Sequence, residues 1–308
     1  MKTEHKWSWP IAGYLFLGGL GGGSIIISSA SDIFFGFGDV FALGSLLTTI
    51  TLGLGSSLLI FELGRPLQFW RVFSTQKAIM TFGAWILSLL IATSFMYFSF
   101  WPEFSPWHEL VILRKILATL NLLLGIGVCA YTGILLGSMR ARRFWNSPIV
   151  PVLFLVSGVS TGLASHSLLA GLWPFTGSNE IVEMLHALLP TIDLVMIALE
   201  FFIIILYLFM MRFFSDEVSQ KVAQSWLSGT KSVAFWGGMV GTGLIIPALL
   251  YSLSSNIGLV LAPILVLIGG LVLRFLVVYS DERTLIPGET KFYERLPEGN
   301  EAFLKILK

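Results

Sequence analysis

Apolar residues fill this chain in long runs that are separated by short polar or Gly/Pro-rich stretches. A helix needs about 20 apolar residues to cross the hydrocarbon core of a bilayer. Eight runs meet this length, and turn signals such as FGFGD, WPEFSP, WPFTGSNE and SLSSN lie between them. The pattern predicts an all-α integral membrane protein, with eight transmembrane helices at 9–31, 40–61, 79–100, 110–137, 148–173, 186–211, 232–254 and 258–280.

The composition agrees with lipid as the solvent of most of the chain. Charged residues make up 12% of the 308 positions, against about 25% in soluble domains. The net charge of +1 gives no indication of nucleic acid binding. A single cysteine, Cys129, excludes a cysteine-ligated cluster, a zinc site or an internal disulfide within this chain. The first apolar run lacks a convincing cleavage site, so we expect a transmembrane helix there.

The cations are distributed unequally between the two predicted faces. All but three of the 19 Lys and Arg lie in the N-terminal segment, in the loops after helices 2, 4 and 6, and in the C-terminal tail. An even number of crossings places these segments on one face. Only Arg114 and Lys115 fall on the other face, and Arg274 lies within the last helix. The asymmetry predicts a multi-pass protein of the plasma (inner) membrane with both termini in the cytoplasm.

Predicted helices 1 and 5 share a faint repeat. Each opens with proline, continues with LFL and then becomes rich in small residues. This repeat favours two four-helix bundles, at 1–137 and 138–280, followed by a cytoplasmic tail at 281–308. The alternative is that small residues are common at any contact between membrane helices.

Four polar side chains fall in one layer near the basic face. By a rise of about 1.5 Å per residue, Tyr14, Tyr131 and Arg274 lie roughly 8–9 Å deep, and Glu62 ends the second helix. Phenols, a carboxylate and a guanidinium suit a ligand with exchangeable oxygens, such as quinone or quinol. Each also has an ordinary interpretation: interfacial tyrosines, an exposed Glu62–Arg65 pair, or an arginine that reaches the phosphate layer.

Helix 6 carries two acids deep in the membrane. Asp193 and Glu200 are seven residues apart, so they lie on one helix face about 10 Å apart. Such costly groups indicate a proton relay or an ion path. The alternative is a buried pair with Arg274 that holds the helices together.

Histidine placement does not favour haem. The pairs that bind haem b sit on facing helices at matched depth, whereas His166 lies inside helix 5 and His186 begins helix 6. We expect no haem and no metal in this chain, and interpret His166 as a hydrogen-bonded core residue.

The stretches WPIAGYLFLGGLGGG, FELGRPLQFWRVF, YTGILLGSMRARRFWNSPIVPVLFLVSGVSTG and LIGGLVLRF resemble the NrfD/PsrC family, the membrane subunits of polysulfide-reductase-type respiratory complexes. The resemblance runs in order through nearly the whole chain. It implies eight helices in two four-helix bundles, no haem and a quinone site for menaquinone or ubiquinone. It further implies partners: a four-cluster type iron–sulfur subunit and a catalytic subunit of the molybdopterin type.

The resemblance also assigns roles to individual residues. It implies quinone binding by Tyr14, Tyr131 and Glu62, and proton or charge transfer by Glu62 and by the set Asp193, Glu200 and Arg274. Glu62 departs from the family pattern, which has aspartate there. The loop after helix 1, DIFFGFGD, lacks the basic residues of relatives that act outside the cytoplasm, so we expect cytoplasmic docking, as in sulfur-reductase or sulfite-dehydrogenase relatives. The alternative is that the basic loops only complement an acidic iron–sulfur partner, on whichever side it docks.

Together these observations predict a quinone-reactive anchor that exchanges electrons with an iron–sulfur partner, while another protein acts on the terminal substrate. Two alternatives remain open. The first is a proton- or cation-coupled transporter, for which GTGLIIP in helix 7 would supply a helix break. The second is a structural anchor without chemistry.

Overall fold

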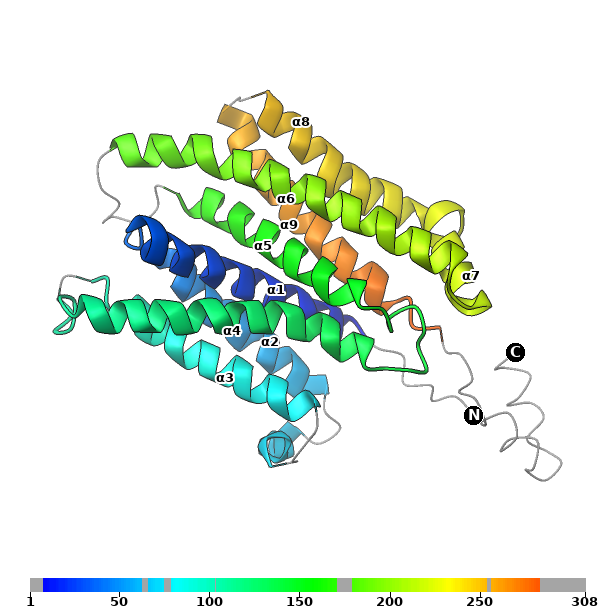
Figure 1. Cartoon of the computed structure of the whole chain (residues 1–308), viewed down its shortest axis with the longest axis horizontal. Coiled ribbons are helices and arrows are strands. Elements are labelled where there is room, and N and C mark those ends of the chain that lie inside the picture. Colours follow the sequence, from blue (N-terminus) through cyan, green and yellow to red (C-terminus); the bar gives the residue numbers. More distant parts are fainter. Residues whose placement is uncertain are drawn as a thin grey trace.

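The computed structural model describes residues 8–62, 66–74, 79–102, 104–170, 179–253 and 256–282. Most of the predicted tail, and the cations Lys2, Lys6, Arg65 and Lys77, lie outside these ranges. The described part is helical, and its elements lie side by side in Figure 1. In chain order they are α1 (Trp9–Ala30), η1 (Ser31–Phe35), α2 (Ala42–Glu62), η2 (Pro66–Phe73), α3 (Ile79–Phe98), α4 (Val111–Gly137), α5 (Ile149–Leu169), α6 (Asn179–Phe213), α7 (Glu217–Ser228), η3 (Val233–Ile245), α8 (Ile246–Ser252) and α9 (Asn256–Val278).

The prediction of eight membrane-spanning segments is confirmed. In the described residues, eight helical stretches are long and apolar enough to cross a bilayer. The first joins α1 to the π-helix η1, and the seventh joins the π-helix η3 to α8. The protein is therefore a multi-pass membrane protein.

The first helix is the centre of the assembly, because α1 contacts α2, α4, α5 and α9. It begins after Ser8, whose backbone is extended, and Pro10 lies in its first turn. Glycines bring α1 and α5 together: a Cβ at Gly23 would overlap the carbonyl oxygen of Gly158, and one at Gly162 would overlap Gly23. Close backbone approach of this kind drives helix association in lipid, where no hydrophobic force acts between helices.

The glycines of the faint repeat thus have a packing role, since they join the two helices that the repeat relates. Helix α5 contacts α1 and α4 as well as α6 and α9. The division into two four-helix bundles at residue 137 stays a prediction.

Three elements differ from the sequence prediction. Helix α6 begins at Asn179, seven residues before the predicted start, and continues through Pro190. The possible break at GTGLIIP in helix 7 does not appear as a break, because the backbone stays helical where η3 meets α8 just before Pro247. The third difference, α7, was not predicted; it is amphipathic and buries Val222, Ala223 and Trp226.

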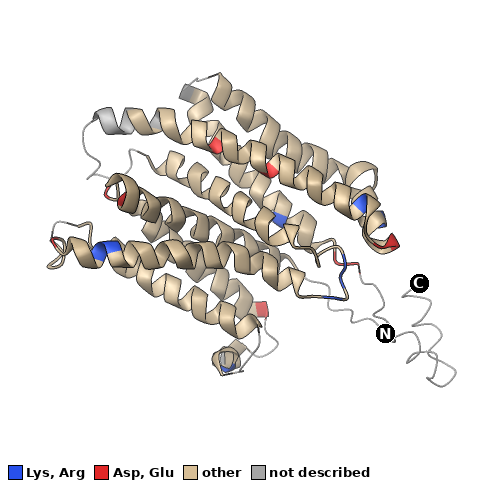
Figure 2. Ribbon diagram, viewed as in Figure 1, with Lys and Arg blue, Asp and Glu red and all other residues tan. Residues whose placement is uncertain are grey.

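Charges gather near the ends of the helices, with a few positions midway along α6 and α9 (Figure 2). At the end of the bundle away from the start of α1, Asp32 is fully buried and binds two partners. Arg114 Nη2 lies 3.0 Å from Asp32 Oδ1, and the Tyr97 hydroxyl donates to Oδ2 at 3.0 Å. One of the two cations predicted on this face is therefore neutralised within the protein.

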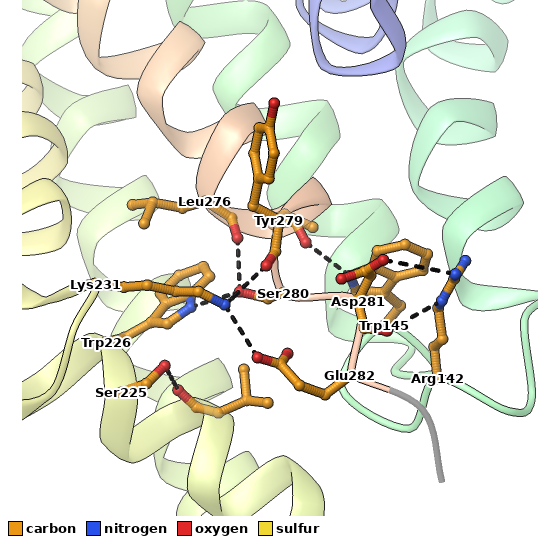
Figure 3. A network of polar contacts seen from close by, with 12 residues as sticks. Arg142, Trp145, Ser225, Trp226, Lys231, Leu276, Tyr279, Ser280, Asp281 and Glu282 are labelled. Carbon is orange, nitrogen blue, oxygen red and sulfur yellow. Dashed lines mark hydrogen bonds and ion pairs between the residues drawn. The ribbon is translucent and has the colours of Figure 1, made fainter. Parts of the chain in front are cut away.

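At the other end, the end of α9 is fixed to the α4–α5 loop and to α7 (Figure 3). Trp145 Nε1 donates to the carbonyl of Val277 at 2.7 Å, and Trp226 Nε1 donates to Ser280 Oγ at 2.8 Å. The ion pair Arg142–Asp281 and a second between Lys231 and Glu282 extend this network. The α4–α5 loop, α7 and the end of α9 consequently form one connected surface on the face where α1 begins.

Candidate functional site

A cavity of about 400 Å³ lies among α1, α2, α3, α4 and η2. It occupies the end of the bundle where α1 and α3 begin and where α2 and α4 end. Its walls are largely apolar, with side chains such as Leu59, Phe69, Phe73, Leu87 and Leu135. Three of the polar groups predicted from the sequence, Tyr14, Glu62 and Tyr131, line this cavity.

The two tyrosines come from α1 and α4 and are almost wholly shielded from solvent. Tyr14 is 3% exposed and Tyr131 is 6% exposed. They lie close enough to interact electrostatically. Both hydroxyl groups therefore belong to one shielded site rather than to the interfacial belt of the ordinary interpretation.

The carboxylate of Glu62 is held at the edge of the cavity by the start of α1. Ser8 Oγ donates a hydrogen bond to Glu62 Oε1 at 2.5 Å. Ser8 precedes the first helical residue, and Glu62 is the last residue of α2. The ends of two helices thus fix the acid beside the two phenols.

Arg274 does not join this cavity, although its depth along α9 suggested that it would. The side chain is buried between α1, α5 and α9, where Nη1 donates to Ser157 Oγ at 3.0 Å and Nη2 to the Phe154 carbonyl at 3.3 Å. Its guanidinium carbon also lies 4.2 Å from the centroid of the Phe154 ring. Depth along α9 gave no information on the direction in which the Arg274 side chain points.

The acids of α6 and Arg274 form a second polar cluster. Asp193 is fully buried and accepts hydrogen bonds from Ser160 Oγ at 2.7 Å and the Tyr251 hydroxyl at 2.9 Å. Glu200 interacts with Ser157 and, electrostatically, with Arg274. Serines one turn apart on α5 therefore connect both acids to the same helix.

A second cavity of about 400 Å³ approaches Asp193 from the opposite end of the bundle. It lies between α6, α8 and α9, and Tyr251, Thr191 and Ser252 contribute its polar groups. Tyr251 lines this cavity, and its hydroxyl group donates a hydrogen bond to Asp193. The Tyr251 side chain therefore connects the cavity to the acid.

Sequence reasoning missed several residues of both sites. Ser8 was identifiable as a helix N-cap before Trp-Pro, but its contact with Glu62 was not. The residues Phe69, Val72 and Phe73 belong to η2, which the sequence had treated as loop. Tyr251 follows an ordinary apolar stretch and carries no motif.

The histidines and possible metal ligands were the last group of residues considered in the sequence. His166 is buried, and its Nε2 lies 3.0 Å from the Ser24 carbonyl oxygen, as expected for a hydrogen-bonded core residue. The side chain of His186 lies outside the described part of the structure. Among the described residues, no group of three or more His, Cys, Asp or Glu could hold a metal ion.

Comparison with known families matches residues 1–285 to the family described as "Polysulphide reductase, NrfD". The chain belongs to the NrfD family. This NrfD-family protein is 35% identical to the C chain of polysulfide reductase from Wolinella succinogenes, over 90% of its own length and 94% of that protein. It is 28% identical to protein NrfD of Escherichia coli, over 91% and 96% of the two proteins. It is also 24% identical to the C subunit of selenate reductase from Mesobacillus selenatarsenatis, over 90% and 74%.

Proposed function

We propose that this protein is the quinone-reactive membrane subunit of a respiratory oxidoreductase complex. The observation that carries the proposal is the cavity in which Tyr14, Glu62 and Tyr131 meet. Two of the similar proteins are named as one lettered component of a reductase, which supports membership in a multi-subunit complex.

The cavity fits a quinone in size and chemistry. Its volume of about 400 Å³ lies within the range of sites that bind small organic molecules. Apolar walls from α2, α3 and η2 suit an aromatic ring and its isoprenoid tail, and the polar groups offer hydrogen bonds to two ring oxygens. Menaquinone and ubiquinone share these features.

The roles of the side chains follow from their chemistry. A bound quinone or quinol supplies two-electron, two-proton redox chemistry. Tyr14 and Tyr131 donate hydrogen bonds to ring oxygens and orient the ring. Glu62 accepts a proton from a ring hydroxyl as electrons leave, or returns one in the opposite direction. Ser8 keeps the Glu62 carboxylate facing the cavity.

Electrons pass to or from an iron–sulfur subunit, of the four-cluster type, that docks where α1 begins. The cavity lies at this face, so the path to a docked cluster is short. A catalytic subunit of the molybdopterin type, acting on a polysulfide-, sulfur- or sulfite-type substrate, completes the complex. The basic loops on this face favour a location in the plasma (inner) membrane with the docking face and both termini in the cytoplasm.

Asp193, Glu200 and Arg274 provide a proton path through the second half of the chain. The cavity beside Tyr251 supports this, because it brings a polar opening close to Asp193. The same observation supports the alternative, a proton- or cation-coupled transporter. A third alternative, an anchor without chemistry, predicts no quinone binding.

The quinone site is tested by Tyr131→Phe and Glu62→Gln in the assembled complex. Each variant should lower quinone turnover by about 100-fold, because a hydrogen-bond donor or a proton acceptor is lost, while activity with artificial dyes stays unchanged. Tyr279→Phe is the matched control, since Tyr279 lies at the half-exposed end of α9. Full quinone turnover in both site variants would refute the assignment.

Two measurements distinguish the alternatives. Purification from the native membrane should yield iron–sulfur and catalytic subunits together with this protein, whereas a protein that purifies alone and moves a solute into vesicles is a transporter. For the proton path, Asp193→Asn should abolish quinone-dependent pH changes in vesicles. Unchanged pH signals with a lower unfolding temperature would instead show that Asp193 only holds the helices together.

A further inference from the structure

We propose that Gly83 of α3 is a positioning residue that fixes the Tyr131 hydroxyl in the quinone cavity. The inference rests on the proposed function and adds a residue that carries no polar group of its own. Both residues line the same cavity, and they come from neighbouring helices.

The ring of Tyr131 rests on the backbone of α3 where Gly83 lacks a side chain. A Cβ atom built at Gly83 would overlap the Cζ, Oη and Cε1 atoms of Tyr131. The hydroxyl end of the ring thus occupies the space that any other residue at position 83 would fill.

Packing is what holds this hydroxyl group in place. In the part of the chain that the structure describes, the Tyr131 hydroxyl makes no hydrogen bond to another protein group. Helix propensity favours alanine over glycine at an interior position such as 83, so the glycine has a cost within α3. The glycine offsets this cost by leaving space for the phenol ring of Tyr131.

An alanine at position 83 should move the phenol rather than the helix. The overlapping atoms are the far end of a side chain that rotates about χ1, whereas backbone atoms are not among the nearest contacts. The Tyr131 hydroxyl would then leave its position in the cavity that Tyr14 also lines, and a misplacement of about 1 Å can lower turnover by roughly 100-fold.

The experiment compares Gly83→Ala with Gly127→Ala in the assembled complex. Gly127 lies one turn before Tyr131 on α4, and a Cβ there would make only an ordinary contact, 3.8 Å from Ile86 Cγ2. Gly83→Ala should lower quinone turnover by about 100-fold and weaken the Kd for menadione, a soluble naphthoquinone, with dye activity and unfolding temperature unchanged. Gly127→Ala should change none of these quantities.

A double variant separates positioning from general packing. In a Tyr131→Ala background, adding Gly83→Ala should leave the Kd for menadione unchanged, because the displaced group is absent. A further loss of affinity there, or equal losses for Gly83→Ala and Gly127→Ala, would overturn the proposal.

The two proposals fail in different ways. Full quinone turnover in both Tyr131→Phe and Glu62→Gln would refute the quinone site itself. Loss of turnover in Tyr131→Phe together with normal turnover in Gly83→Ala would refute only the positioning role of Gly83.

Discussion

Buried polar side chains are costly in a membrane, and this protein satisfies most of them within its own helices. Asp193 shows how: its two oxygens accept hydrogen bonds from α5 and α8. Glu62 receives a bond from Ser8 across two helix ends. At the scale of single residues, the buried acids therefore bind small polar partners that no motif identifies.

Tyr251→Phe tests the support of Asp193. Removing one donor from a buried carboxylate should destabilise the protein by about 1–3 kcal/mol, which should lower the thermal unfolding midpoint in detergent. Tyr279→Phe is the control, and an equal midpoint in the two variants would contradict the expected role of the Tyr251–Asp193 bond.

Ser8→Ala tests the support of Glu62. The loss of a hydrogen bond to a charged group, worth about 1.5–3 kcal/mol, should free the carboxylate to leave its position. We expect quinone turnover to fall by about tenfold, a smaller loss than in Glu62→Gln because the acid itself remains. Ser57→Ala provides the control, because it removes only an exposed hydrogen bond from the Ser57 hydroxyl to the Gly53 carbonyl within α2. An unchanged rate in Ser8→Ala would show that Glu62 does not need this contact.

At the scale of elements, the close approach of α1 and α5 determines how the rest of the bundle is placed. Glycines at 23, 158 and 162 leave the two backbones in contact. Since α1 also contacts α2 and α4, a displaced α1 would carry Tyr14 and Ser8 away from the proposed quinone cavity.

Gly158→Leu tests this contact between helices. A leucine side chain at the crossing would force α1 and α5 apart, so we expect poor accumulation in the membrane or a lower unfolding temperature. Gly53→Leu is the matched control, because nothing lies within 4 Å of a Cβ at Gly53. Equal accumulation and stability of the two variants would contradict the importance of the α1–α5 crossing.

At the scale of the whole molecule, the bundle places its two polar sites differently. The proposed quinone cavity lies near the face where α1 begins, and the second cavity approaches Asp193 from the other end. A network around Arg142, Lys231 and the end of α9 connects separate segments at the face where α1 begins (Figure 3).

Cysteine labelling tests the orientation in the membrane. The native Cys129 is fully buried, so it should not react with an impermeant maleimide. Arg143→Cys, in the α4–α5 loop, should react only from the cytoplasmic side, and Glu109→Cys, in the α3–α4 loop, only from the opposite side. The reverse labelling pattern would place the docking face outside the cytoplasm.

The sequence alone determined the membrane class and the number of spans. Length and hydropathy set these features, because the hydrocarbon core accepts only long apolar helices whose backbone groups are paired internally. The same reasoning selected Tyr14, Glu62 and Tyr131, because polar side chains within membrane-spanning helices are costly and therefore rare.

Only the tertiary structure decided which of these side chains meet. Depth is a coordinate along one helix, whereas the neighbours of a side chain depend on the rotation and packing of several helices. For this reason Arg274, predicted at the depth of Tyr131, lies with Ser157 and Glu200 and not in the cavity that Tyr14 and Tyr131 line. Contacts from distant parts of the chain, such as Ser8 with Glu62 and Gly83 with Tyr131, exist only once the helices are packed.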